Sequence, residues 1–184
     1  MNTRDKITRL ADQLIRKQGY NAFSYKDLSE PMQVRNAAIH YHFPAKADVG
    51  IAVIDKAIRE FDEYKQQWSD LPENEQLEQF AQMYMRNCKQ GLICLMGSLA
   101  PDYLTLPEAM QMKVRAMGQD LLDWLTYCLE QGRKKGLFSF SGEAYDRALL
   151  VASTLLSALL LNRVLGEDTF QRMYDQLLSD LLKK

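Results

Sequence analysis

The sequence predicts an all-α protein of about nine helices, arranged as an N-terminal three-helix domain followed by a larger helical domain. Three observations predict this class. Apolar residues recur at helical spacing through most of the 184 residues. Only nine Gly and five Pro interrupt the chain, so long helices can form. No convincing strand is present, since residues 137–140 form too short a run to change the class.

The first helix is expected over residues 3–18. One apolar stripe at i, i+3, i+4, i+7 and i+8 supports it, made of Ile7, Leu10, Ala11, Leu14 and Ile15. Thr3 is the expected N-cap, and Gly19 suits the left-handed residue after the last turn.

Two short helices are expected next. Ser24 starts the first of them, and Asp27 stands where its side chain can bond back to the cap. Pro31 limits this helix, because proline lacks an N–H group and disfavours helical backbone at Glu30. The second short helix runs over about 36–43, and Pro44 ends it.

The remaining chain predicts longer helices over about 45–68, 75–90, 107–135, 142–165 and 167–182, with a broken segment at 91–106. Pro107 can open the third of these helices, and Gly136 can end it. The helix over 142–165 has a core, 148–161, that is apolar on nearly every face. A single neighbouring surface therefore cannot cover it.

Charge and cysteine content bound the function. Residues 1–50 hold eight Lys/Arg and five acids, a net charge of +3, whereas the whole chain carries −1. A basic N-terminal end suits a nucleic-acid partner. The three cysteines form no C-x-x-C pair, which argues against disulfides and a zinc site and suits a reducing cytoplasm. Residues 148–162 are too short and too polar for a membrane span. We therefore expect a cytoplasmic protein without a membrane partner. We also expect no metal and no cofactor.

Three helices within the first 45 residues, two of them short, indicate a helix-turn-helix. In this motif the second short helix enters the DNA major groove, and the preceding helix braces it across the backbone. The turn is expected at 31–35. Val34, Ile39 and Phe43 have the spacing that would hold the reading helix on the core, with Asn36, His40 and Tyr41 on its outer face.

These residues resemble the TetR family of bacterial one-component transcriptional repressors. The resemblance lies in three runs, Phe23-Ser24-Tyr25-Lys26-Asp27-Leu28-Ser29, then Val34-Arg35-Asn36-Ala37-Ala38-Ile39-His40-Tyr41-His42-Phe43, then Lys46. It covers about 45 residues. The chain departs from the family pattern at four positions: Pro31, Gln33 in place of a turn glycine, Arg35 in place of a Ser-like cap, and His40 in place of the common Tyr.

The resemblance implies a DNA-binding domain at 1–45, with its motif at about 24–43, and an effector-binding and dimerisation domain at 46–184. Residues implied to touch phosphates or to brace the backbone contact are Tyr25, Lys26, His40, His42 and Lys46. Residues implied to meet base edges are Arg35, Asn36, Ala38 and Tyr41. Side-chain chemistry agrees, because Arg can read guanine, Asn can read adenine, and an Ala methyl can pack on thymine.

Six methionines between 83 and 117 suit either a flexible helical core or a pocket that repacks around apolar effectors. The expected ligand-binding residues are Phe61, Tyr84, Cys88, Tyr103, Met110, Met117, Leu121, Trp124 and Cys128. The last two helices are expected to form a four-helix bundle with those of a second copy. The expected interface residues are Leu155, Leu159, Met173, Leu177 and Leu181.

The function that the sequence favours is a homodimeric repressor, released from a palindromic operator by a small, largely apolar effector. Two alternatives stay open. One is a DNA-binding dimer regulated without a small ligand, and the other is an all-helical interaction protein that binds no DNA. An enzyme is not expected, because none of the common catalytic motifs is present and both His residues lie in the DNA-reading segment.

Overall fold

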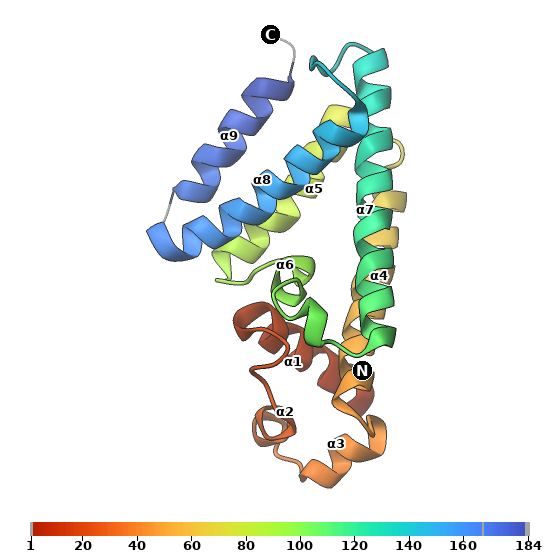
Figure 1. The fold of residues 1–184 in the computed structure, drawn as a ribbon, viewed down its shortest axis with the longest axis vertical. Helices are drawn as coiled ribbons and strands as arrows, with labels where there is room; N and C mark the ends of the chain where they lie inside the picture. Colours follow the sequence, from red (N-terminus) through yellow and green to blue (C-terminus); the bar gives the residue numbers. More distant parts are fainter. Residues whose placement is uncertain (1, 167, 183–184) are drawn as a thin grey trace. The chain divides into compact units, whose positions relative to one another are not determined.

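The computed structural model describes residues 2–166 and 168–182. These residues form an all-α fold (Figure 1), as the sequence predicts. Its helices are α1 (Thr3–Gln18), α2 (Tyr25–Met32), α3 (Asn36–His42), α4 (Lys46–Trp68), α5 (Glu73–Lys89), α6 (Leu95–Leu99), the 3-10 helix η1 (Tyr103–Thr105), α7 (Glu108–Lys134), α8 (Ala144–Leu165) and α9 (Thr169–Leu181). Within the described part of the chain, the one β contact is an isolated antiparallel bridge between Phe138 and Leu182.

The chain divides into two compact units. The first contains the residues up to Asp62 together with Leu95–Met117, and the second contains Glu63–Cys94 together with the residues from Gly118 onward. Helices α4 and α7 contribute residues to both units. The first unit therefore extends past residue 45, and the division of DNA binding and effector binding at that residue stays a prediction.

The core of the first unit contains residues from the four helices α1, α2, α3 and α4, from α6 and from the start of α7. Helix α1 contributes its apolar stripe, of which Ile7, Ala11 and Ile15 are fully buried and Leu10 and Leu14 partly buried, and α6 packs directly on α1. The buried cluster contains Ile7, Ala11, Ile15, Leu28, Ile39, Phe43, Val49, Val53, Ile54, Leu99 and Met110, among others. Each large apolar side chain that is fully buried contributes about 1.5–3 kcal/mol, so this cluster holds α2 and α3 in place.

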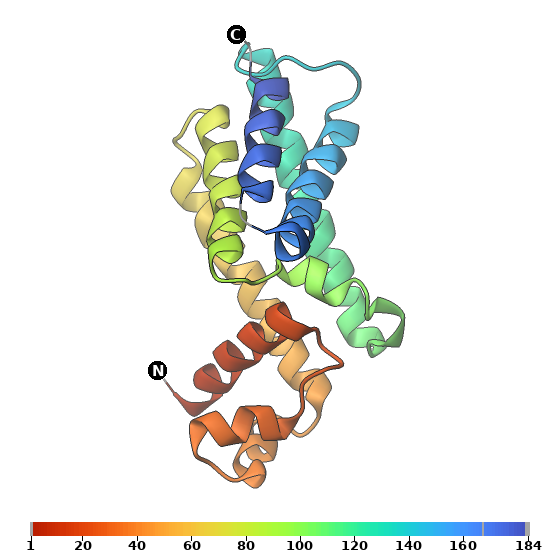
Figure 2. The ribbon, with the colours of Figure 1, turned by 90° about the vertical axis from the view of Figure 1, so that its left-hand side faces the viewer.

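The second unit is organised around α8, which packs along both α5 and α9 (Figures 1 and 2). Its fully buried apolar residues include Leu77, Phe80, Leu125, Leu129, Val151, Leu155 and Phe170. Helix α8 has buried residues towards these neighbours and exposed leucines elsewhere. By length and composition it is also the one helix, among the residues described, that could cross a membrane.

Two helix starts show how well local capping was predicted. The Asp27 carboxylate accepts hydrogen bonds from the Ser24 N–H and hydroxyl groups, both at 2.7 Å, as expected. The Ser24 hydroxyl and N–H lower the pKa of Asp27. The prediction of Thr3 as a cap was wrong. Asn2 caps α1, because its side-chain oxygen accepts from the Asp5 N–H at 2.8 Å.

Several helix boundaries differ from the expected ones. Helix α2 continues over Pro31 to Met32, so Glu30 stays helical; a proline this close to the helix end removes only one intrahelical bond. Helix α5 starts at Glu73, since the Pro72 carbonyl already accepts from the Gln76 N–H at 2.9 Å. Helix α8 starts at Ala144 rather than at Gly142, whose φ of 82° is not helical. Residue 167, the expected start of the last helix, lies outside the described residues.

Candidate nucleic-acid interface

Helices α2 and α3 form a helix-turn-helix (Figure 2). Gln33 makes the turn in the left-handed conformation, with φ 55° and ψ 38°. Its N–H donates to the Glu30 carbonyl at 3.0 Å, and the Val34 N–H donates to the Ser29 carbonyl at 3.1 Å. These two bonds satisfy the carbonyls at the end of α2. The turn is thus built without the expected glycine.

The inner side of α3 is apolar, as predicted. Ile39 and Phe43 are fully buried in the core of the first unit, and Val34 packs partly buried against the same cluster. Because an α-helix advances about 100° per residue, residues 37 and 41 lie farthest from the buried direction of Ile39.

The exposed side of α3 follows this geometry. Tyr41 is 84% exposed, and Ala37 is exposed beside it. Arg35, Asn36 and His40 are exposed as well. Ala38, the alanine expected to meet a base edge, is half-buried on the flank of the helix. The outer alanine is Ala37, which the 3.6-residue period would have identified once Ile39 was assigned to the core.

Asn36, the first residue of α3, is bonded to α2. The buried hydroxyl of Ser29 donates to the Asn36 amide oxygen at 2.5 Å. Residue spacing alone does not reveal this bond, because it depends on how α2 and α3 cross.

Tyr25 braces the end of α3 rather than presenting its hydroxyl outward. This hydroxyl donates to the Phe43 carbonyl at 2.7 Å, and the ring meets the His40 ring edge-on at a centroid distance of 4.4 Å. Burial, followed by the charge of Asp48, raises the pKa of Tyr25.

Arg4 is a second brace, which was not predicted from the sequence. Its guanidinium lies over the Phe43 ring at 4.3 Å and donates to the His42 carbonyl at 3.0 Å. Arg4 and Tyr25 thus donate to the carbonyl groups of His42 and Phe43, at the C-terminal end of α3.

The two lysines expected at phosphates differ in their surroundings. Lys26 is exposed and lies 3.4 Å from the Glu30 carboxylate. The Lys46 ammonium lies over the rings of Tyr20 and Phe23, at 4.6 and 4.5 Å from their centroids. Burial lowers the pKa of Lys46, partly offset by two nearby aspartates. His42, expected in the same group, is half-buried, with its ring edge-on to Tyr41 at 5.1 Å.

The residues expected to bind an effector are divided between the two units. Phe61, Tyr103, Met110 and Met117 belong to the first unit, where Met110 is fully buried in the core. Tyr84, Cys88, Leu121, Trp124 and Cys128 belong to the second unit. Leu121 is only half-buried; Leu125 and Leu129 form the buried side of α7 there.

Trp124 lies within an aromatic cluster of the second unit, 5.9 Å from Trp68 and 5.3 Å from Phe80 between ring centroids. Tyr84 meets Phe80 edge-on at 5.3 Å. The buried Cys128 thiol lies 3.4 Å from the Glu73 carbonyl. The four aromatic side chains pack on one another.

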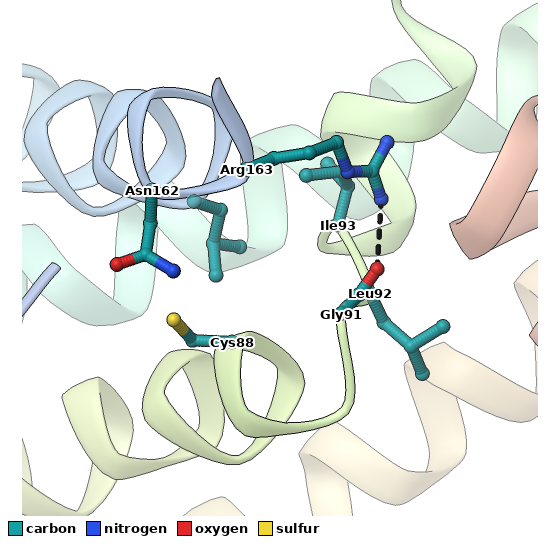
Figure 3. Close-up of a pocket in the computed structure, with 7 residues that line it drawn as sticks. Cys88, Gly91, Leu92, Ile93, Asn162 and Arg163 are labelled. Carbon is teal, nitrogen blue, oxygen red and sulfur yellow. Dashed lines mark hydrogen bonds between the residues drawn. The ribbon is translucent and has the colours of Figure 1, made fainter. Parts of the chain in front are cut away.

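One cavity of about 270 Å³ lies in the second unit (Figure 3). The end of α5, the segment after it and the end of α8 line it, through Cys88, Gly91, Leu92, Ile93, Leu159, Asn162 and Arg163. Arg163 donates to the Gly91 carbonyl at 3.0 Å. The Asn162 amide oxygen accepts from the Phe170 N–H at 3.2 Å. Of the expected ligand-binding residues, Cys88 lines this cavity, and burial raises the pKa of its thiol.

The residues expected at a dimer interface need correction. Leu155, Leu159 and Leu181 are buried inside the chain, against the neighbouring helices of the second unit, so they are not part of its free surface. Met173 and Leu177 are half-buried. A different stripe of α8 is exposed and apolar, and it consists of Leu149, Leu150, Leu160, Leu161 and Val164, which we call the α8 stripe.

Comparisons with known proteins agree with this architecture. The family described as "Bacterial regulatory proteins, tetR family" matches residues 7–53. A TetR-family transcriptional regulator from Agrobacterium tumefaciens is 30% identical, with a TM-score of 0.91 over 98% of this chain and 97% of that one. A TetR transcriptional regulator from Legionella pneumophila is 29% identical, with a TM-score of 0.88 over 98% of both chains. The repressor NemR of Escherichia coli is 22% identical over 85% of this chain and 82% of its own. The chain therefore belongs to the TetR family of DNA-binding transcriptional regulators, which are not enzymes.

Proposed function

We propose that the protein is a homodimeric repressor that binds a palindromic operator and leaves it when a small effector binds. The observation that carries this proposal is the helix-turn-helix, in which Ile39 and Phe43 fix α3 to the core while the opposite side of α3, with Tyr41, is exposed. NemR, which is similar over 85% of this chain and 82% of its own, is named a repressor, and this supports repression rather than activation. A soluble, cytoplasmic protein follows from this role.

DNA binding is tested first. Duplexes selected from a random pool should carry an inverted repeat, with half-sites about one helical turn apart. Arg35→Ala should lower affinity for the selected duplex. The exposed Lys17, which lies on α1 rather than on α3, offers a charge-matched control in Lys17→Ala. A protein that enriches no duplex would instead favour the all-helical interaction module.

The α8 stripe supports dimerisation. Its members form two groups, at positions 149–150 and 160–164, which lie within about 120° of one another around α8. They are 39–80% exposed in the single chain. Ser153 and Ser157 lie between the two groups. Exposed apolar side chains gathered on one side of a helix favour an interaction site on a soluble protein. Two copies of one helix can pack on each other about a two-fold axis. We therefore assign the stripe to a second copy of the chain rather than to a membrane, since α8 already packs along α5 and α9.

Sedimentation velocity tests the dimer. The wild-type chain should sediment as a dimer at micromolar concentration, and Leu160→Glu in the α8 stripe should sediment as a monomer. Leu104 is 90% exposed but belongs to η1, so Leu104→Glu is a matched control that should remain dimeric. A monomeric wild-type protein would rule out the interface.

The cavity of the second unit is the site that we propose for the effector. Its volume of about 270 Å³ suits a compact molecule, and its lining combines leucine and isoleucine side chains with Asn162, Arg163 and the Cys88 thiol. This lining suits an apolar body that carries one hydrogen-bonding group.

A release assay tests the effector site. Small apolar compounds that bear one carbonyl or carboxylate group are screened for release of a fluorescent operator duplex. A compound that releases the wild-type protein should fail with Leu92→Trp, which fills the cavity, and should still act on Leu104→Trp. Equal action on both variants would place the effector elsewhere. If no compound in a broad screen releases the duplex, a dimer regulated without a small ligand becomes the better explanation.

A further inference from the structure

The side chain of Asn36 is turned towards α2. It lies about 60° around α3 from the buried Ile39, by the 100° advance per residue. Its amide oxygen accepts from Ser29, a residue of α2 that is only 5% exposed. A bidentate contact with adenine needs the oxygen and the nitrogen of an asparagine amide together at one base edge. An amide oxygen held by a buried hydroxyl is poorly placed for this contact.

Two other residues of α3 lie on the side of the helix that faces away from the core. Ala37 and Tyr41 lie about 160° from the direction of Ile39, and both are exposed. The His42 ring stands edge-on beside the Tyr41 ring, with an interplanar angle of 79°. A large aromatic side chain that is 84% exposed on a reading helix is otherwise unexplained.

The chemistry of this outward pair is mainly apolar. Ala37 offers one methyl group, and Tyr41 offers an aromatic ring with a hydroxyl at its tip. In the major groove, thymine is marked by its C5-methyl group, which apolar side chains contact. Guanine, adenine and cytosine present only hydrogen-bonding groups there, which a methyl group does not recognise.

We propose that Ala37 and Tyr41 read thymine methyl groups in the operator, and that Asn36 is a positioning residue, which Ser29 holds to fix α3 on α2. This proposal rests on the proposed entry of α3 into the major groove. It assigns specificity to the middle of the outer face and removes Asn36 from the residues that read bases.

Replacing thymine by uracil in the operator tests the reading pair without altering the protein. Uracil keeps every hydrogen-bonding group of thymine and lacks the methyl group. At one or two thymine positions, the replacement should weaken binding by the wild-type protein about 4-fold for each methyl group removed, the value of one buried carbon, and thus about 15-fold when one position is replaced in both half-sites. If wild-type protein binds the duplex but tolerates uracil at every thymine, the reading pair is refuted, while the proposed function stands.

Protein variants then assign the contact to a residue. Ala37→Gly should weaken binding to the thymine duplex more than to the uracil duplex, because the methyl partner is already absent from the latter. Ala38→Gly is the matched control, since it makes the same change in α3 at a half-buried flank position. It should affect both duplexes equally. Equal behaviour of the two variants would overturn the role of Ala37.

The positioning role predicts a different pattern. Asn36→Ala and Ser29→Ala should each weaken binding about 2- to 10-fold, the value of one hydrogen bond. The loss should be the same for every duplex, and the double variant should lose no more than either single one. Ser29→Thr, which keeps the hydroxyl, should restore binding. Relaxed selection at one adenine in Asn36→Ala alone would show that Asn36 reads that base and would overturn this role.

Discussion

Gln33 occupies the left-handed region at the centre of the helix-turn-helix, with φ 55° and ψ 38°. This backbone costs an L-residue about 1–2 kcal/mol, whereas glycine adopts it freely. Gln33→Gly should therefore stabilise the first unit. Both hydrogen bonds of the turn involve backbone atoms only, and glycine keeps them.

The expected magnitude is the difference between two effects. Relief of the strained backbone stabilises the folded chain by about 1–2 kcal/mol. Glycine also increases the freedom of the unfolded chain, which removes about 0.4–1 kcal/mol of this gain. Taking the midpoint of each range, the net rise in the free energy of unfolding is about 0.8 kcal/mol, or about 2–3 °C in Tm for a chain of this length.

Urea unfolding followed by circular dichroism measures the change, at one protein concentration because the proposed dimerisation would add to stability. Gln33→Ala keeps an L-residue in the turn and should gain nothing. Gly19, with φ 92° and ψ 162°, lies in a region that only glycine adopts easily, so Gly19→Ala should lose stability. A Gln33→Gly protein no more stable than Gln33→Ala would refute the strain argument.

Three further predictions concern packing, bracing and pH. At Gly132 an added Cβ would lie 2.3 Å from the Phe138 ring. Overpacking of about 1–3 kcal/mol should outweigh the gain in helix propensity of about 1 kcal/mol. The Gly132→Ala variant should therefore unfold at a lower urea concentration than the wild type, and a higher midpoint would contradict this. Tyr25→Phe loses the hydroxyl bond to the Phe43 carbonyl and should cost about 0.5–1.5 kcal/mol in thermal unfolding, with equal loss of affinity for all duplexes; a change in base preference would instead make Tyr25 a reader. Burial, with the charge of Glu73, raises the pKa of Cys128 from 9.0 to about 12. The contribution of this thiol to the free energy of unfolding is therefore fully present below pH 9 and is lost as the pH rises to about 12. In the wild type the urea midpoint should fall from about pH 9 to 11, and in Cys128→Ala it should fall less. An equal fall in both proteins would argue against this pKa shift.

Local signals predicted the DNA-binding end well. The bond between Ser24 and Asp27 depends on residues three apart, and the burial of Ile39 and Phe43 follows from helical periodicity. The tie between Ser29 and Asn36 could not be predicted, because it depends on the crossing of two helices.

The second unit was less predictable for a physical reason. When nearly every face of α8 is apolar, periodicity no longer separates buried from exposed positions. The packing of α5 and α9 decides that Leu155 is core and that Leu160 is surface. The cavity depends likewise on three chain segments that meet only in the folded protein, so Cys88 alone among its lining residues was expected.

The placement of Lys46 bears on how tightly the protein holds DNA as ionic strength rises. Each cationic side chain that neutralises a phosphate releases a counterion, and it adds about 0.9 to the slope of log affinity against log salt concentration. The Lys46 ammonium lies over Tyr20 and Phe23 and donates to the Asn21 carbonyl at 3.4 Å. In this placement it is bound by the protein rather than by a phosphate. A dimer would then release about two fewer counterions than its basic residues suggest, and its affinity would fall less steeply with salt.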